Sequence, residues 1–377
     1  MSVAVKWMGC FLDPSGYAEA NRNYVAALHS VGVDVSCQLV SFDKTRTDYG
    51  KAGEICKSLI GKQNNAKIKV IFLTPEHYPI YREKDKYNIG LFVLETDRLP
   101  DEWVKACNSS LDEIWTASEW NKEVFINSGI KRPVYVFPHC FNPEEYKNVN
   151  NFVIDGLDSN WFKFYSIFQW SERKNPVGLL KAYLTEFTAD DPVVLILKTY
   201  GSNFSPQEVL QMKNRIKGVR DDIGNKNSQP KILLLSDSLR RDQILGLHKA
   251  GDCFVLINKA EGWGLPHFEA CAMGKPVITT NYGACKEFCK PEHSYLVDWQ
   301  PTPVTGMSWI KWYNSRMSWA EPNIVHTKQL MRSLFQNRQE GLINGSKAKE
   351  FISDHFSYLK VGQDIKKRLD LIIHGIN

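Results

Sequence analysis

Residues 253–280 read CFVLINKAEGWGLPHFEACAMGKPVITT, and this stretch decides the fold. An apolar run leads into a loop with two glycines, helix-forming residues follow, and a second apolar run comes after the helix. Gly274 stands where a glycine commonly ends a helix, just before the second run at Val277 and Ile278. Apolar runs that alternate with helices are typical of parallel strands covered on both faces. The stretch therefore predicts a strand–loop–helix–strand unit of an α/β sheet.

The same alternation continues along nearly the whole chain. Two helix starts are marked clearly, by Ser205-Pro206 with Glu208 three residues after the Ser, and by Asn175-Pro176. The predicted strands are residues 3–7, 33–40, 67–73, 88–94, 113–116, 134–137, 163–168, 193–199, 231–235, 253–258, 276–280 and 295–297. Such alternation implies parallel sheets joined by right-handed crossovers.

One segment interrupts the alternation. Residues 142–159 are rich in Asn, Asp, Pro and Gly, so we interpret them as a linker between two Rossmann-like domains, at 1–145 and 160–355. The amphipathic segment 359–373 predicts a final helix, within 356–377, that docks on either domain, and a return to the first domain is one expectation. Residues 319–332 predict a helix with an N-terminal cap, packed on the second domain.

Composition narrows the class of protein. The 377 residues suffice for about two domains, and the net charge of +5 suits an anionic ligand without requiring nucleic acid. No apolar run is long enough to predict a membrane span, and the first nine residues do not resemble a signal peptide. The nine cysteines show no paired metal spacing. Free thiols in the cytoplasm are therefore the expectation.

The loop before the helix at 266–273 carries the strongest chemical pattern. Gly262 and Gly264 allow backbone amides to approach a ligand, and the first turn of the helix offers free N–H groups. Glu261 lies in the loop, and Glu269 lies about two turns into the helix. Carboxylates accept hydrogen bonds from hydroxyls and repel phosphates. The pattern is compatible with two carboxylates that bind two sugars, a ribose and a transferred sugar. Taken alone, it is also compatible with a surface loop followed by an ordinary helix on which Glu269 is solvated.

Residues 261–278 closely resemble the E-x7-E signature of the family-4 retaining glycosyltransferases, EGFGLP-x-x-EAMA-x-G-x-PVI. The resemblance implies the α/β GT-B fold, two Rossmann-like domains whose parallel sheets face each other across a cleft. It also implies transfer from a nucleotide-diphosphate sugar, with retention and with no metal or other cofactor. No Asp-x-Asp triplet occurs in the chain. Glu261 would contact the donor sugar and Glu269 the ribose. The amides near the sugar and diphosphate would be those of Gly262, Trp263, Gly264 and Leu265.

A second segment, FQWSERKNP at 168–176, follows the first strand of the second domain. Fixed cations there would stabilise the charge that develops on a leaving diphosphate. The family places an Arg and, five residues later, a Lys on that group. Lys174 matches the Lys, but Gln169 stands at the Arg position, and Arg173 is the candidate for the second cation. We expect the backbone from Ser236 to residue 239 to recognise the base.

The first domain carries weaker resemblances. Ser15-Gly16 follows the first strand, so Gly16 would lie near the donor diphosphate at a helix start. His77 stands in a segment similar to one whose His touches the donor sugar or the reaction centre in the family. We assign Tyr17 and Glu95 to the acceptor side.

The sequence thus predicts a hexosyl- or pentosyltransferase with an unidentified hydroxyl acceptor. Alternatives for the acceptor are a glycan, a lipid-linked acceptor reached by peripheral membrane contact, a small molecule, and a modified base in DNA. Two other functions stay open. One is a GT-B phosphorylase-like enzyme that uses no nucleotide, and the other is a non-catalytic module that binds a nucleotide sugar or nucleic acid. The chain lacks the G-x-S-x-G, P-loop and G-x-G-x-x-G patterns of other α/β enzymes.

Overall fold

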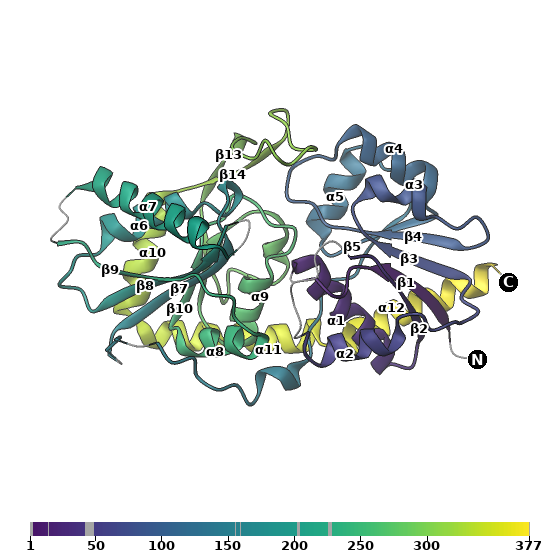
Figure 1. Ribbon diagram of the computed structural model, residues 1–377, viewed down its shortest axis with the longest axis horizontal. Helices are drawn as coiled ribbons and strands as arrows, with labels where there is room; N and C mark the ends of the chain where they lie inside the picture. The colour runs from purple at the N-terminus through teal and green to yellow at the C-terminus, as the bar shows by residue number, and fades with distance from the viewer. Residues whose placement is uncertain are drawn as a thin grey trace. The chain divides into compact units, whose positions relative to one another are not determined.

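The computed structural model describes residues 3–13, 15–41, 49–154, 156–158, 160–201, 204–224 and 228–376. The chain divides into two compact units, each built on a six-stranded parallel sheet (Figure 1). Unit 1 comprises Met1–Glu144 with Ser353–Asn377, and unit 2 comprises Glu145–Ile352. One boundary therefore falls in a short 3-10 turn, η2 (Pro143–Tyr146), within the predicted linker, of which residues 155 and 159 lie outside the described residues. The other falls within the helix α11 (Arg338–Phe356).

The sheet of unit 1 has the strand order β2-β1-β3-β4-β5-β6, and every neighbouring pair is parallel. The strands are β1 (Ala4–Gly9), β2 (Asp34–Leu39), β3 (Ile68–Phe72), β4 (Tyr87–Leu91), β5 (Glu113–Thr116) and β6 (Val134–Val136). The connecting helices are α1 (Gly16–Ser30), α2 (Gly50–Leu59), α3 (Tyr78–Tyr81), α4 (Asp101–Ser110) and α5 (Glu119–Asn127). All six strands predicted in this half of the chain are present, with slightly different ends.

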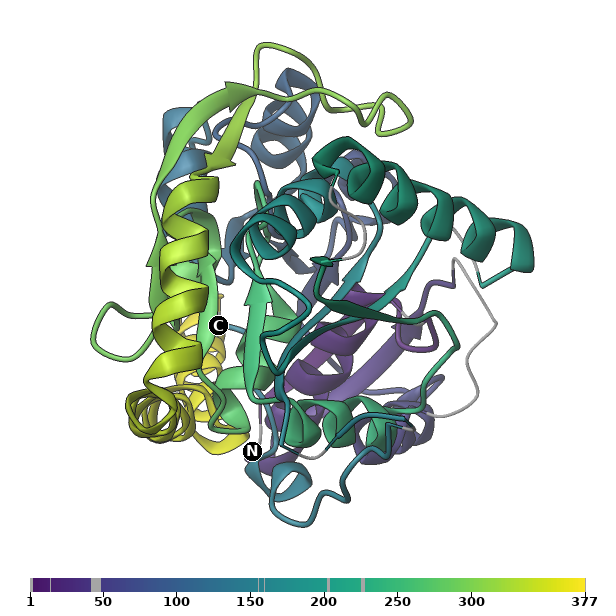
Figure 2. The same cartoon turned by 90° about the vertical axis from the view of Figure 1, so that its left-hand side faces the viewer.

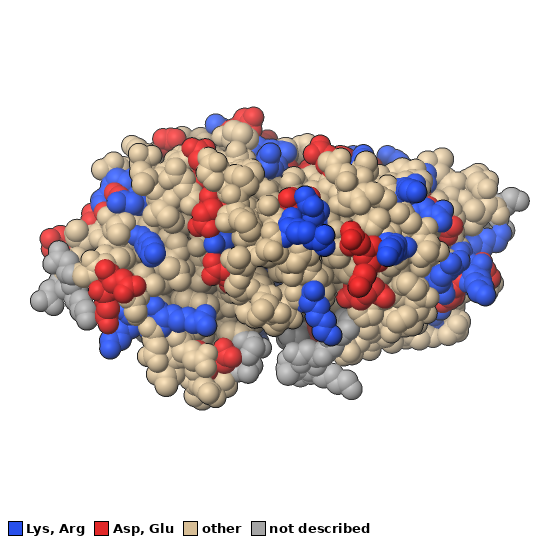
Figure 3. All heavy atoms as spheres, turned by 90° about the horizontal axis from the view of Figure 1, so that it is seen from above, with Lys and Arg blue, Asp and Glu red and all other residues tan. Residues whose placement is uncertain are grey.

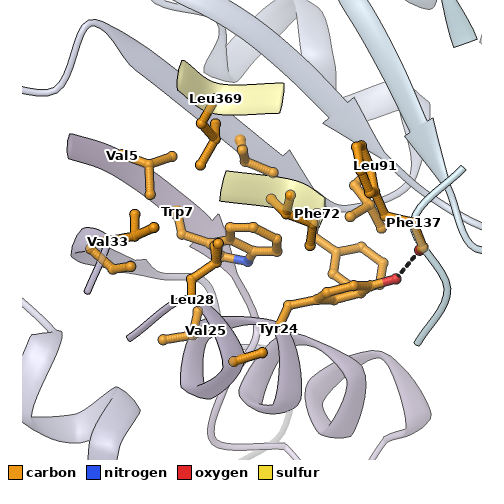
Figure 4. Packing of buried hydrophobic residues seen from close by; sticks show 14 of the residues in the cluster. Val5, Trp7, Tyr24, Val25, Leu28, Val33, Phe72, Leu91, Phe137 and Leu369 are labelled. Atoms are coloured by element: carbon orange, nitrogen blue, oxygen red, sulfur yellow. Dashed lines mark hydrogen bonds between the residues drawn. The ribbon is translucent and has the colours of Figure 1, made fainter. Parts of the chain in front are cut away.

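The core of unit 1 lies between one face of this sheet and the helix α1. Trp7 and Phe72 from the sheet pack against Tyr24 of α1, and all three side chains are fully buried (Figure 4). The polar atoms of these aromatic rings are paired, because Trp7 Nε1 donates to Asn21 Oδ1 at 2.8 Å and the Tyr24 hydroxyl donates to Phe137 O at 2.5 Å. The rings therefore contribute apolar area to the core without leaving a donor unsatisfied.

The C-terminal helix α12 (Tyr358–Ile376) belongs to unit 1. Its buried residues Val361, Ile365, Leu369 and Ile372 recur every three or four positions and join the core of unit 1. Arg368 of the same helix forms an ion pair with the fully buried carboxylate of Glu113 in β5. The apolar stripe of α12 thus buries one face of the helix in unit 1, and the ion pair with Glu113 links the helix to β5.

Unit 2 has the strand order β12-β11-β10-β7-β8-β9, again with parallel pairs throughout. The strands are β7 (Phe162–Gln169), β8 (Val193–Tyr200), β9 (Lys231–Leu235), β10 (Cys253–Leu256), β11 (Val277–Thr280) and β12 (Tyr295–Val297). The helices are α6 (Pro176–Glu186), α7 (Pro206–Ile223), α8 (Arg241–Ala250), α9 (Leu265–Ala272) and α10 (Ile324–Gln336). The caps predicted for two of them are confirmed, since Ser205 Oγ accepts from Glu208 N and Asn175 Oδ1 from Gly178 N.

One prediction for unit 2 is wrong. Residues 319–322 do not begin a helix but belong to the strand β14 (Ser318–Pro322), which pairs antiparallel with β13 (Trp299–Pro303). The helix α10 follows directly (Figure 2), and Asn323 caps it by accepting from His326 N at 3.0 Å. The cap was therefore expected a few residues too early.

The charges of the two units are mixed. On the face drawn in Figure 3, Lys and Arg side chains alternate with Asp and Glu side chains, without a broad area of one sign. Among the described residues, no helix combines the length and the apolar character that a membrane span requires.

Candidate donor-binding site

The candidate site lies at the carboxyl edge of the sheet of unit 2, where the loops after β7 and β10 meet. These strands are neighbours in the sheet, so the loops that follow them lie side by side. Three hydrogen bonds join the loops: Lys259 N donates to Arg173 O at 2.8 Å, Arg173 Nη1 donates to Ala260 O at 2.9 Å, and Asn175 Nδ2 donates to Ile257 O at 3.1 Å. Ligand crevices of open α/β sheets form at this edge.

Glu261, Lys174 and Arg173 form one buried ion cluster at this junction. Lys174 Nζ pairs with Glu261 Oε1, and Arg173 Nη1 lies 3.1 Å from Glu261 Oε2. Burial alone would raise the pKa of Glu261, but Lys174 and Arg173 outweigh it and lower that pKa to about 2. Burial lowers the pKa of Lys174, and Glu261 opposes this shift. Two cations around one carboxylate leave a positive charge, which an anionic ligand can neutralise.

The loop from 262 to 265 needs glycine at one position. Gly264 has φ +93° and precedes α9, and a Cβ there would lie 2.6 Å from Cys285 Sγ and 3.0 Å from His267 Nδ1. Only glycine therefore fits both the backbone and the space. Gly262 is buried, Leu265 begins the helix, and the indole of Trp263 packs against Phe288 at a centroid distance of 4.9 Å. Trp263 thus turns its side chain to the core, and its backbone carbonyl accepts from Cys285 Sγ at 3.3 Å.

Glu269 is the centre of a second buried network. Arg241 Nη1 pairs with Glu269 Oε1, and His248 Nε2 lies 3.3 Å from Glu269 Oε2. His248 Nδ1 lies 3.0 Å from the Tyr165 hydroxyl, and Arg241 Nη2 donates to the Tyr146 hydroxyl at 2.9 Å. Burial lowers the pKa of His248, so the neutral ring accepts from Tyr165 and donates to Glu269. Each carboxylate oxygen keeps lone pairs, so Glu269 can still accept a bond from a ribose hydroxyl.

Two other predicted donor-binding residues follow the neighbouring strands. Gln169 ends β7, and its amide Nε2 donates to Gly201 O at 3.0 Å. Ser236 follows β9 and is half-buried. The neutral amide of Gln169 therefore binds the backbone just after β8 and does not supply the positive charge that an Arg would bring to this position.

The remaining predicted residues belong to unit 1. Gly16 is the first residue of α1, which Ser15 caps by accepting from Ala18 N at 3.2 Å. Tyr17 donates its hydroxyl to Val93 O at 3.3 Å. His77 ends a short turn, η1 (Pro75–His77), with Nδ1 3.2 Å from Thr74 Oγ1. Glu95 is half-buried after β4. Their roles stay predictions.

Sequence reasoning missed three partners of the site. Arg241 and His248 bind the carboxylate of Glu269. Lys259 Nζ lies 2.8 Å from Glu172 Oε1 and 2.7 Å from Glu321 Oε2. Lys259 thereby ties β14 to the loop that carries Arg173. Each contact joins positions far apart in the chain, and no spacing rule marks them. A buried Arg, His or Lys is recognised only once the sheet order is known.

Residues 163–300 match the family model of the group 1 glycosyl transferases. The chain is 23% identical over 220 residues to uncharacterized protein 356 of Sulfolobus islandicus rod-shaped virus 1, a match that spans only 56% of each chain. Its fold is similar to that of Anabaena Alr3699/HepE, solved in complex with UDP and glucose, with 14% identity, a TM-score of 0.65, and coverage of 98% of this chain and 99% of that one. Sucrose-phosphate synthase (tll1590) from Thermosynechococcus elongatus gives 12% identity, a TM-score of 0.69, and coverage of 99% and 100%. The chain therefore has the GT-B fold, and its match to the family model of the group 1 glycosyl transferases covers residues 163–300.

Proposed function

We propose that this protein is a retaining glycosyltransferase that moves a sugar from a nucleoside diphosphate sugar to a hydroxyl acceptor, without a bound metal. The observation that carries the proposal is the buried cluster of Glu261, Lys174 and Arg173 beside the amino end of α9. Its residual positive charge and the free amides of the helix suit a diphosphate. UDP is the first nucleotide to test, because HepE was solved with UDP and glucose.

Each part of the cluster has a separate task in this proposal. As the bond from the sugar to the diphosphate breaks, negative charge grows on the leaving oxygen, and Lys174 and Arg173 stabilise it. These cations act where many phosphate-handling enzymes use a metal ion. Glu261, freed from one of its partners by the donor, accepts hydrogen bonds from the sugar hydroxyls. Glu269, held by Arg241 and His248, accepts from the ribose.

Two further features belong to the proposal. The acceptor is a hydroxyl compound of unidentified class, and among the alternatives a glycan, a lipid-linked acceptor, a small molecule and a modified base in DNA stay open. The nine buried free thiols favour a reducing compartment such as the cytoplasm.

A thermal-shift screen tests the donor class. UDP, ADP, GDP, UDP-glucose and inorganic phosphate are each added to the complete chain, with EDTA present throughout. We expect one nucleoside diphosphate to raise Tm selectively. Stabilisation by phosphate alone would favour a phosphorylase-like enzyme instead. Once the donor is identified, proton NMR of the product shows the anomeric configuration of the transferred sugar. An inverted configuration would refute the proposed retention.

A further inference from the structure

Lys198 is a buried cation that lies outside the ion clusters described above. It stands in β8, and only 4% of its surface is exposed. In the described part of the chain its ammonium has neither a hydrogen bond nor an ion pair. The ammonium lies 5.8 Å from the ring centre of Tyr200 and 5.3 Å from that of Phe204. Aromatic faces compensate a desolvated charge only in part, so an anionic ligand would stabilise this ammonium.

The side chain of Lys198 points to the carboxyl edge of the sheet. Tyr200 is the last residue of β8, and Phe204 comes after it, so the two rings beside the ammonium mark this direction. Tyr200 pairs with Gln169 on β7. Residues two apart on a strand share a face, and paired residues of parallel strands do as well. Lys198 therefore extends along the same face as Gln169, toward the level where Gln169 ends its strand.

The charges near the site favour an anionic ligand for this ammonium. Gln169 is neutral, and Arg173 and Lys174 share the carboxylate of Glu261. Those three charges leave a single positive charge, whereas each phosphate of a nucleoside diphosphate sugar carries a negative one. Lys198 carries a further positive charge on the neighbouring strand β8.

Few other charges face Lys198. Asp237 follows β9 and is exposed, and Glu208 of α7 packs directly against Gly201. Its neighbours on β7 and β9, Ile167 and Leu235, are apolar. Burial lowers the pKa of Lys198 to about 8, and Asp237 opposes this shift. Burial raises the pKa of the Tyr200 phenol, which stays neutral near pH 8.

We propose that Lys198 is a donor-binding residue, whose ammonium binds a phosphate oxygen of the nucleoside diphosphate from the β8 side of the site. Phe204, which is 43% exposed, is the side chain that has to move to admit the phosphate. The inference rests on the proposed function, because that function supplies the anion.

Calorimetric titration with UDP and with uridine tests the proposal. The variants are Lys198→Met, which keeps the length of the side chain, and Lys217→Met on the exposed face of α7 as the matched control. We expect Lys198→Met to weaken UDP binding by about 10- to 100-fold, the value of a charge-assisted hydrogen bond, and to leave uridine binding unchanged. Lys217→Met should bind both as the wild type does.

A second readout follows proton uptake. Burial lowers the pKa of Lys198 to about 8, and a bound phosphate would raise it again, so the wild type should take up protons when UDP binds near pH 8. Titrations in buffers with different ionisation enthalpies measure this uptake, which Lys198→Met should abolish. A purely structural Lys198 would not produce it.

The outcomes separate the two proposals. If Lys198→Met binds UDP as tightly as the wild type, Lys198 does not contact phosphate, and the proposed function stands. If the wild type binds no nucleoside diphosphate, the proposed function fails and this inference with it. Since Met removes a buried unpaired charge, Tm of Lys198→Met should equal or exceed that of the wild type. Should Lys198→Met not fold, Lys198→Gln takes its place in the same titrations, with the same expected loss of UDP affinity.

Discussion

Replacing Glu261 with Gln should strongly destabilise unit 2, because the carboxylate is the counter-charge of the buried Lys174 and the partly buried Arg173. Glu261 is 5% exposed and Lys174 is 8% exposed. Removal of one partner of a buried ion pair costs about 3–5 kcal/mol, because the other charge stays in a medium of low polarity. Lys174 would then be the uncompensated charge, and Arg173 beside it would add repulsion. We therefore expect Glu261→Gln to lower the free energy of unfolding by about 3–5 kcal/mol.

Urea unfolding of the complete chain, followed by tryptophan fluorescence, measures this change. The midpoint should fall while the slope stays constant, since the surface exposed on unfolding is the same. In a double-mutant cycle, Lys174→Met should restore part of the stability of Glu261→Gln, because it removes the stranded charge. Asp242→Asn is the control, since Asp242 pairs with Arg240 at the surface and its loss should cost less than about 1 kcal/mol. If Glu261→Gln lowers the free energy of unfolding no more than Asp242→Asn does, the reasoning is refuted.

Three further predictions concern other parts of the chain. Burial raises the pKa of Glu269, but Arg241 outweighs it and holds that pKa at about 2, below the ordinary 4.5. The ionised Glu269 therefore stabilises the fold fully above pH 4.5, and this stabilisation is lost as the pH falls toward 2. Over this pH range, Tm of the wild type should drop more steeply than Tm of Glu269→Gln. Gly264→Ala should lower the free energy of unfolding by about 1–3 kcal/mol, because φ +93° strains any other residue; urea midpoints equal to the wild type would contradict this. Arg368→Ala should cost about 3–5 kcal/mol, since it removes the counter-charge of the buried Glu113, which keeps only the hydrogen bonds from Trp115 and Tyr87. Leu371→Ala at an exposed position of α12 is the control in the same denaturation assay.

Most of the fold could be predicted from the sequence, because parallel strands buried on both faces are visible as short apolar runs. The twelve predicted strands are all present. The hairpin of β13 and β14 was missed, since Pro301 and Pro303 argue against a strand and the pairing is antiparallel. The amphipathic pattern of α12 predicted a helix that buries one face, but it could not say which unit receives that face.

The candidate site was predicted less completely. Glu261 and Lys174 were found because their segments, each between a strand and a helix, resemble motifs of the family-4 glycosyltransferases. The sheet order then brings the two residues together across 87 positions. The bonds of Glu269 to Arg241 and His248 could not be foreseen, because they depend on how α8 packs against α9. Lys198 looked like one more residue of an apolar strand, and its burial distinguishes it.

Release of UDP from UDP-glucose in the presence of EDTA tests the central claim most directly, namely that the cluster of Lys174, Arg173 and Glu261 handles a nucleotide-sugar donor without a metal. We predict slow hydrolysis by the wild type, unchanged by the chelator and by Lys217→Met. Lys174→Met should reduce it by about 100-fold or more, since the lost cation stabilises the leaving diphosphate. Hydrolysis that persists in Lys174→Met, or that EDTA abolishes in the wild type, would contradict the account.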